Sequence, residues 1–309
     1  MIFAKENRVA ILMATYQGER YISDQLDSFE RQTYENWELI VSDDGSTDST
    51  LTLVNDFSVR NVAKVKIVSG PGKGFVSNFL SLLFRDDITA DFYSFSDQDD
   101  IWFDDKIERA VAWLKQIPSE TPALYCSRTL LVNNNGESIC NSPLFRRAPS
   151  FSNALVQNIG GGNTMVMNQA ARELIKNAGF VNVVSHDWWI YILISGANGA
   201  IYYDPEPTLG YRQHSENLIG TNLGYRARFV RLKKIIQGQY RNWNASHIRE
   251  LDRNKSLLTN ENKIKFNWFK SIHNKCVFKR VYYFLKLGIY RQNFVDTLAV
   301  FISAILKKV

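Results

Sequence analysis

The chain has few of the features that mark several common protein classes. It contains three cysteines in 309 residues, Cys126, Cys140 and Cys276. A set that is odd in number and widely spaced fits neither a disulfide framework nor a zinc site, so free thiols in a reducing cytoplasm are expected. No stretch reaches the roughly 18 uninterrupted apolar residues of a membrane span, and the apolar run near the N-terminus is too short for a signal peptide. These absences predict a protein kept on the cytoplasmic side of a membrane.

Charge is divided unevenly along the chain. Residues 221–309 carry 19 Lys and Arg against 4 Asp and Glu, a net charge of +15, whereas residues 1–220 carry 18 against 27, a net charge of −9. So abrupt a change predicts two parts with different partners. We expect one domain over 1–220 and a basic extension over 221–309.

Residues 1–220 alternate between short apolar strands and amphipathic helices. The expected strands cover 8–15, 37–42, 64–69 and 91–96. A helix is expected after each strand. The first carries Ile22, Leu26 and Phe29, the second carries Leu51, Val54 and Phe57 and has Ser46 as its N-cap, the third carries Phe79 and Leu82, and the fourth covers 103–116. This order predicts an α/β fold, in which a mainly parallel sheet has helices on both faces.

The pattern changes after residue 123. We expect strands at 123–127 and 129–133, a turn at 133–136, a glycine loop entering a strand over 158–168, helices at 169–178 and 185–196, and extended segments at 200–205 and 208–214.

Polar side chains gather where three of the first four strands end. Thr15, Tyr16 and Glu19 follow the first strand, Asp43 and Asp44 the second, and Asp97 and Asp99 the fourth. Parallel sheets of this kind bind ligands in the crevice beyond the carboxyl ends of their strands. The coincidence of the three groups predicts a ligand site at that edge.

The segment SFSDQDDIWF places Asp97, Asp99 and Asp100 within four positions. Carboxylates crowded at a strand end are tolerated when a cation neutralises them, and oxygen ligands suit Mg²⁺ or Mn²⁺. Mg²⁺ often uses one or two carboxylates together with substrate phosphates. We expect Asp97 and Asp99 to form such a site, whereas Asp100, Asp104 and Asp105 are expected to begin the next helix, where negative charge is favoured.

The segments ILMATYQGERYISDQLDSFERQTYENWELIVSDDGSTDST and SFSDQDDIWFDDKI resemble the inverting family 2 glycosyltransferases with the GT-A fold. The resemblance covers roughly residues 8 to 215. Within that family, SDQDDIW resembles bacterial rhamnosyltransferases that build cell-surface polysaccharides such as O-antigen. It implies a Rossmann-like nucleotide-binding half, a metal cofactor (Mg²⁺ or Mn²⁺) and a nucleotide-sugar donor.

The resemblance also implies roles for particular residues. The residues implied to bind the donor are Thr15, Tyr16, Glu19, Asp43, Asp44, Asn78, Asp97, Gly161 and Gly162. Those implied to bind the metal are Asp97, Asp99 and His214. Asp187 is implied to be the general base, and His186 and Trp188 are implied to contact the acceptor. The family usually has Glu-Asp where this chain has His186 and Asp187. His186 therefore departs from the pattern, while Asp187 keeps the position of the base.

Each of these roles has a plainer alternative. Asn78 is equally well an ordinary polar residue of a helix, and residues 160–163 a turn before a buried strand. Asp187 is also typical of a helix N-terminus. A lone histidine such as His214 is often structural, and a tryptophan such as Trp188 often belongs to a core. His247 and His273, in the basic segment, are expected to have no role in a site.

The basic extension interleaves lysine and arginine with aromatic residues at helical spacing, as in 225–236, 263–275 and 277–294. Basic amphipathic helices with aromatic residues are typical of elements that lie on an anionic membrane surface. Packing on the catalytic domain is the second interpretation. Nucleic acid binding fits the charge but lacks a recognisable module, so none is expected.

These observations together predict a metal-dependent inverting transferase that uses dTDP-β-L-rhamnose and a saccharide or lipid-linked saccharide acceptor, at the inner face of the cell membrane. Three alternatives remain open. They are the same fold with a UDP-hexose donor, a non-catalytic membrane-associated scaffold, and a nucleotidyltransferase. The last would need a lysine- and glycine-rich loop after the first strand, where this chain has TYQGER with Arg20 alone basic.

Overall fold

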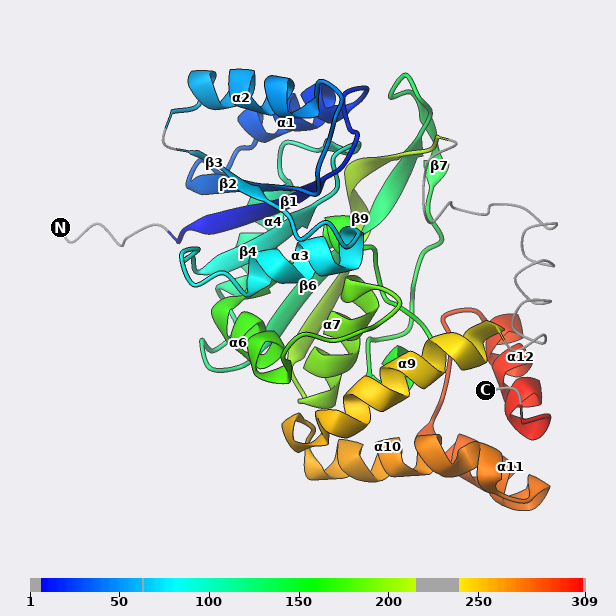
Figure 1. Cartoon of the computed structure of the whole chain (residues 1–309). Coiled ribbons are helices and arrows are strands. Elements are labelled where there is room, and N and C mark those ends of the chain that lie inside the picture. The colour runs from blue at the N-terminus through cyan, green and yellow to red at the C-terminus, as the bar shows by residue number, and fades with distance from the viewer. Residues whose placement is uncertain (1–6, 63, 215–238, 308–309) are drawn as a thin grey trace.

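The structure is a computed structural model that describes residues 7–62, 64–214 and 239–307 (Figure 1). The basic segment 225–236, which belongs to the expected extension, lies outside these residues.

The described residues form one mixed sheet of nine strands in the order β3-β2-β1-β4-β8-β6-β9-β5, with β7 paired to β6. The strands are β1 (Val9–Thr15), β2 (Trp37–Asp43), β3 (Val65–Ser69), β4 (Phe92–Ser96), β5 (Ile101–Trp102), β6 (Ala123–Val132), β7 (Ser138–Asn141), β8 (Val166–Asn168) and β9 (Ala200–Arg212). The first four strands are parallel, whereas β8 runs antiparallel to both β4 and β6. The expected parallel half is therefore confirmed.

The helices cover both faces of this sheet, as Figure 1 shows. They are α1 (Ile22–Glu30), α2 (Thr50–Arg60), α3 (Phe75–Leu83), α4 (Lys106–Leu114), α5 (Phe151–Ala154), α6 (Gln169–Ala178), α7 (His186–Gly196), α9 (Gln239–Arg253), α10 (Asn260–Ser271), α11 (Val277–Leu287) and α12 (Phe294–Ile305), with short 3₁₀ turns η1 (Gly162–Thr164), η2 (Lys255–Leu257) and η3 (Ile272–Asn274).

Strand β1 shows how two cores arise from one strand. Successive side chains of a strand point to opposite faces. Val9 and Ile11 pack with α1, α2 and α4, while Ala10 and Leu12 pack with α3, α6 and α7. Because β1 is buried on both faces, its sequence is a continuous apolar run rather than an alternating one.

Three sequence expectations were wrong in detail. The two strands expected within 123–133 are one strand, β6 (Ala123–Val132), because β6 pairs with β9 through register shifts near Arg128 that keep the two strands together. The segments at 200–205 and 208–214 likewise join into β9. Ser46 is not an N-cap: α2 begins at Thr50, and the Ser46 hydroxyl donates to Asp43 Oδ1 at 2.6 Å.

The C-terminal helices pack against the sheet domain. Leu251, Leu258, Phe266 and Phe269 lie in the same apolar core as the α3, α6 and α7 side chains. Asn262 Nδ2 also donates to the carbonyl oxygen of Gly196, at the end of α7, at 3.0 Å. The extension therefore shares a core with the helix that carries the candidate base.

No helix in the described part of the chain is both long enough and apolar enough to cross a membrane.

Replacing Phe266 by Ala tests whether the chain unfolds as one unit. Phe266 lies fully buried on α10, so its truncation should reduce the free energy of unfolding by about 3–5 kcal/mol. We expect urea unfolding to shift to lower concentration for the whole chain, with coincident transitions by tryptophan fluorescence and circular dichroism.

Ile264→Ala is the matched control, because Ile264 is exposed on the same helix and its loss should change stability by less than about 0.5 kcal/mol. If the Phe266→Ala protein instead shows two separated transitions, residues 221–309 form an independently folding domain.

Candidate active site

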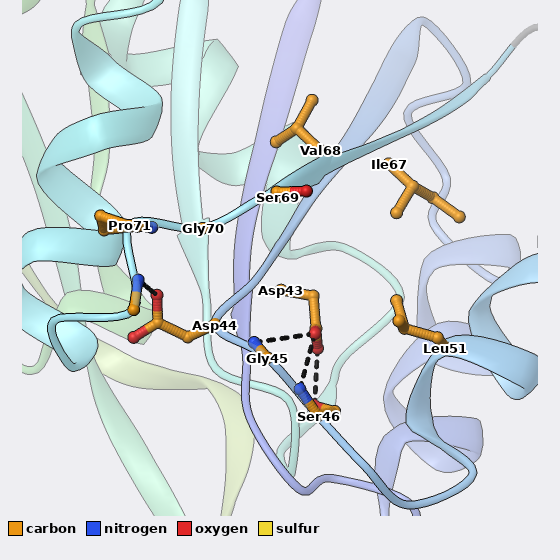
Figure 2. Close-up of a pocket in the computed structure, with 11 residues that line it drawn as sticks. Asp43, Asp44, Gly45, Ser46, Leu51, Ile67, Val68, Ser69, Gly70 and Pro71 are labelled. Atoms are coloured by element: carbon orange, nitrogen blue, oxygen red, sulfur yellow. Dashed lines mark hydrogen bonds between the residues drawn. The ribbon is translucent and has the colours of Figure 1, made fainter.

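A pocket of about 490 Å³ opens at the carboxyl ends of β2 and β3. It is lined by Asp43, Asp44, Gly45, Ser46, Leu51, Ile67, Val68, Ser69, Gly70, Pro71 and Gly72. Figure 2 shows the apolar side chains of Ile67 and Val68 above the loop that carries the two aspartates, and that of Leu51 to the right of it. Apolar walls with a few polar groups, at this edge of a parallel sheet, are typical of a site for a small organic ligand.

Asp43 holds the loop of this pocket in place. Its Oδ1 accepts hydrogen bonds from the hydroxyls of Thr15 at 2.8 Å and Ser46 at 2.6 Å, and its Oδ2 accepts from the backbone N–H groups of Gly45 and Ser46 at 3.0 and 2.8 Å. A carboxylate has about four acceptor positions. All four are therefore used inside the protein, and a bond to a nucleotide base would have to replace one of them.

Asp44 accepts fewer hydrogen bonds within the protein than Asp43 does. Its Oδ1 accepts from the backbone N–H of Gly72 at 2.7 Å and its Oδ2 from that of Gly74 at 2.8 Å, which leaves acceptor capacity on each oxygen. Both glycines have positive φ, +64° and +83°, a conformation that side chains disfavour. Asn78 lies behind this loop, where its Nδ2 donates to the Ser42 carbonyl and its buried Oδ1 has no partner.

The loop after β1 lies beside the segment of Asp97, Asp99 and Asp100, which we call the acidic cluster. The side-chain amide of Gln98 bonds both backbone groups of Tyr16, at 2.9 Å each, so the two loops are locked together. The Tyr16 ring remains exposed and is free to contact a ligand. The Glu19 carboxylate instead accepts from the backbone N–H of Ser49, at the start of α2.

Three carboxylates meet after β4, because Asp100 joins the expected pair of Asp97 and Asp99. Oxygen atoms of Asp97, Asp99 and Asp100 lie within 4.8 Å of one another. Burial, together with the charges of Asp99 and Asp187, raises the pKa of Asp97 to about 8. Asp187 is therefore within electrostatic range of the cluster, although it is far away in the sequence.

Asp100 does not begin a helix, which corrects the expectation for this residue. It is fully buried, β5 follows it directly, and α4 begins only at Lys106 with Asp105 as its N-cap. Asn163, from the glycine loop, donates to Asp100 Oδ2 at 2.6 Å, while Oδ1 has no hydrogen-bond partner. Burial and the charges of Asp99 and Asp97 raise the pKa of Asp100 well above its usual range.

Buried Lys106 adds the opposite charge to this region. Its ammonium lies 4.5 Å from the centre of the Trp102 ring and has no hydrogen-bond partner. Burial lowers the pKa of Lys106 to about 7, although the charge of Asp100 works in the other direction.

His214 reaches the cluster from the end of β9. Its Nε2 lies 2.7 Å from Asp99 Oδ2, and its ring packs against Tyr21 at 5.0 Å between centroids. The buried guanidinium of Arg212 donates to the Asp99 carbonyl at 3.0 Å and pairs with Asp24 at 2.7 Å. The end of β9 and the loop after β4 are therefore fixed to each other.

Asp187, the expected base, begins α7 beside the glycine loop. The backbone N–H of Gly162 donates to its Oδ2 at 3.2 Å, and that of Trp188 donates to its Oδ1 at 2.7 Å. The helix-terminus and base interpretations are therefore compatible. The two bonds orient the carboxylate and leave it further acceptor capacity.

His186 and Trp188 point into the protein, so a direct acceptor contact by either stays a prediction. The His186 ring stacks on Phe79 at 4.3 Å, and a Cβ on Gly162 would lie 2.5 Å from its Nε2. Burial lowers the pKa of His186 to about 4, so the ring is neutral at pH 7. Gly161 is the exposed glycine of this loop, whereas Gly162 is buried.

His247 was expected to have no role, but α9 brings it to the candidate base. It is buried, its ring meets the Trp188 ring edge-on at 4.6 Å, and both its nitrogens lack hydrogen-bond partners. Burial lowers its pKa to about 4, against the opposing charge of Asp187.

The sequence analysis did not identify His247, Asn163 or Arg212, because each contacts residues that are far away in the sequence. For Asn163, its position directly after the glycine run was the one available signal.

The model of glycosyl transferase family 2 matches residues 10–164, half of the chain. The chain belongs to this family. It is 31% identical over 240 residues, 74% of its own length and 81% of the relative's, to a protein named dTDP-rhamnosyl transferase RfbG from Shigella flexneri. It is 29% identical over 187 residues, 60% of its own length and 69% of the relative's, to the Escherichia coli protein named UDP-Glc:alpha-D-GlcNAc-diphosphoundecaprenol beta-1,3-glucosyltransferase WfgD.

Two solved structures show the same fold at low sequence identity. TarS of S. aureus matches with a TM-score of 0.55 and 18% identity over 91% of this chain and 90% of that one. The mannosyltransferase PcManGT of Pyrobaculum calidifontis, in complex with GDP-Man and Mn²⁺, matches with a TM-score of 0.54 and 16% identity over 92% and 74%. The expected GT-A fold and family are therefore confirmed, and the chain is a glycosyltransferase.

Replacing Asn163 by Ala tests the support of the acidic cluster. The change removes the one hydrogen bond of a fully buried carboxyl group, Asp100, and should reduce the free energy of unfolding by about 1–3 kcal/mol. Urea unfolding measures this loss, and Asn135→Ala, at an exposed turn position, should leave stability within about 0.5 kcal/mol of the wild type. Equal stability of both variants would show that Asn163 does not support Asp100.

Proposed function

We propose that this family 2 glycosyltransferase is a metal-dependent inverting enzyme that transfers L-rhamnose from dTDP-β-L-rhamnose to a saccharide acceptor in the synthesis of surface polysaccharide or O-antigen. The observation that carries the proposal is the glycine loop that joins Asp187 to the acidic cluster: the Gly162 N–H donates to Asp187 and Asn163 donates to Asp100. A pocket of about 490 Å³ opens at the same carboxyl edge of the sheet. One site thus combines a candidate base, candidate metal ligands and room for a nucleotide.

Asp187 is proposed to act as the general base. Its carboxylate takes the proton of the acceptor hydroxyl while that oxygen forms a bond to the anomeric carbon. The bond from this carbon to the diphosphate oxygen breaks on the opposite face, and its electron pair leaves with dTDP. A β-linked donor therefore gives an α-L-rhamnosyl product. The N–H groups of Gly162 and Trp188 keep the carboxylate directed toward the acceptor.

The acidic cluster fits Mg²⁺ or Mn²⁺. Oxygen ligands suit both ions, and the three carboxylates already lie within 4.8 Å of one another. Asp100 is engaged with Asn163, so Asp97 and Asp99 would supply the ligands, with His214 joined to Asp99. When bound, the ion supplies positive charge against the leaving diphosphate.

The pocket at the end of β2 is proposed to hold the pyrimidine base. Because Asp43 has its acceptor positions filled, the remaining acceptor capacity of Asp44 makes it the better partner for a ring N–H. The name of the relative that is 31% identical supports a dTDP-rhamnose donor. The second relative's name, which contains UDP-Glc, keeps a UDP-hexose donor as the alternative to test.

The acceptor is proposed to be a saccharide on a lipid carrier, reached from the cytoplasmic face of a membrane by a peripheral protein. The basic extension over 221–309 is the part proposed to contact the anionic surface. Deleting everything after residue 225 cannot test this contact cleanly, because Leu251, Phe266 and Phe269 belong to the core.

Asp187→Asn tests the base. The substitution should lower kcat by about 10²–10⁴-fold, the usual contribution of general base catalysis, while the affinity for the nucleotide stays within about two-fold because the proton moves only in the transition state. Sugar transfer to an acceptor is measured by product mass. Asp56→Asn, at an exposed position of α2, serves as the control, and near-normal turnover of Asp187→Asn would remove Asp187 from the mechanism.

Calorimetric titration with dTDP and UDP, with Mg²⁺ or Mn²⁺ and then with chelator, tests donor and metal together. We expect dTDP to bind more tightly than UDP and the affinity to fall at least about ten-fold with chelator, because the diphosphate then faces unneutralised carboxylates.

Preference for UDP would keep the transferase and overturn rhamnose as the sugar. Equal affinity with and without chelator would overturn the metal site, and no binding of either nucleotide would favour a non-catalytic scaffold.

A further inference from the structure

Helices α11 and α12 form an antiparallel pair with large apolar side chains left in solvent. Arg280, near the start of α11, bonds the carbonyls of Ala304 and Ile305 at the end of α12, and the rings of Phe284 and Phe301 meet at 5.0 Å. The exposed apolar side chains of the pair are Val277, Phe278, Tyr282, Leu285, Phe294, Val295, Leu298, Ile302 and Leu306. We call this set the apolar face.

The spacing shows that these residues are arranged in rows. Phe278, Tyr282 and Leu285 follow i, i+4, i+7 on α11, and Phe294, Leu298 and Ile302 follow i, i+4, i+8 on α12, so each set lies along one side of its helix. Phe278, Phe294 and Leu285 are 87%, 79% and 68% exposed. Exposed apolar rows on two helices that pack together mark an interaction surface rather than ordinary scattered exposure.

The charges around the apolar face are of one sign. Residues 263–307 contain nine Lys and Arg and a single acidic residue, Asp296. Asp296 is buried, with an oxygen 4.0 Å from Arg291 Nε. Lys279 and Lys286 are exposed on α11, and Lys307 is exposed just after α12. The solvent side of the pair therefore presents apolar and cationic groups and no anionic one within the described residues.

The combination of apolar and cationic groups helps to decide between two partners for the apolar face, a second copy of the chain and a lipid bilayer. A second copy of the chain, related by a two-fold axis, would bring two surfaces of the same positive charge together. An anionic bilayer offers lipid tails for the aromatic and aliphatic side chains and phosphates for the lysines. The charge pattern therefore favours lipid.

The helix pair is tied to the catalytic machinery. Between α11 and α12, Tyr290 shares a hydrogen bond with Ser150 at 3.0 Å, and the Tyr191 hydroxyl of α7 donates to the carbonyl of Ser150 at 3.1 Å. Arg291 Nη1 donates to the Val156 carbonyl at 2.9 Å. In Figure 1, β1 runs from the side marked N toward the side of the molecule on which α12 lies.

We propose that the apolar face of α11 and α12 docks on the anionic surface of a lipid bilayer and fixes the orientation of the active site toward it. The inference rests on the proposed function, in which the basic extension contacts an anionic membrane surface, and deepens it by naming the helices and side chains that make the contact. Phenylalanine and leucine side chains enter the interfacial region, while the lysines contact lipid phosphates.

The test uses the full-length chain and vesicles of phosphatidylcholine with and without phosphatidylglycerol. The wild type should co-sediment with the anionic vesicles and bind neutral ones at least about ten-fold less tightly. The triple variant Phe278→Ser, Leu285→Ser, Phe294→Ser should lose at least about ten-fold in affinity for anionic vesicles. The double variant Lys279→Glu, Lys286→Glu should lose about five-fold or more for each lysine.

Val59→Ser, Val62→Ser is the matched control, since Val59 in the last turn of α2 and Val62 just after it are both highly exposed and should not affect sedimentation. Equal binding of neutral and anionic vesicles, or wild-type binding by the triple variant, would overturn the proposal. So would a wild-type dimer that the triple variant dissociates, if no vesicle binding accompanies it, because the face would then join two copies of the chain.

Nucleotide titration of the same variants without vesicles separates this inference from the proposed function. The triple variant should bind dTDP as the wild type does. A wild-type chain that binds vesicles but no nucleotide would contradict the transferase mechanism and leave the docking proposal intact. A wild-type chain that binds nucleotide but no vesicles would overturn the docking proposal and leave the transferase mechanism intact.

Discussion

The crowding of three carboxylates after β4 constrains much of the surrounding structure. Like charges at this distance repel, and in a partly buried site the repulsion is only weakly screened. Asn163 donates to one carboxylate, His214 meets another, and Lys106 lies in the same buried region. These partners come from the glycine loop, the end of β9 and the start of α4, so the charges determine how three distant segments must meet.

Helix α7 connects this site to the rest of the molecule. Its first turn carries Asp187, held by the glycine loop, and its body lies in the core that the C-terminal helices also enter. His247 packs on Trp188, next to Asp187 in the sequence. The extension thus supports the helix that presents the candidate base, and packing, the second interpretation of the basic extension, describes its inner side. Its outer side keeps the features from which membrane contact is inferred.

Pattern and motif gave good guidance where structure depends on local sequence. The four parallel strands and the helices at 169–178 and 185–196 were predictable, because apolar periodicity and turn residues act over a few positions. The division of 123–133 into two strands was wrong because a register shift against β9 preserves one strand. Ser46 and Asp100 were assigned to helix starts, whereas their actual partners, Asp43 and Asn163, are chosen by tertiary contacts.

The sequence by itself determined the family, the parallel half of the sheet, and the placing of polar residues at its carboxyl edge, because strand order and strand ends follow from local patterns. Only the tertiary structure decided which of these groups meet. It brought Asp187 within range of Asp97, filled the acceptor positions of Asp43, and placed His247 beside Trp188. Such contacts join residues that are far apart in the chain, and their geometry is set by how helices and strands pack, which no short stretch of sequence specifies.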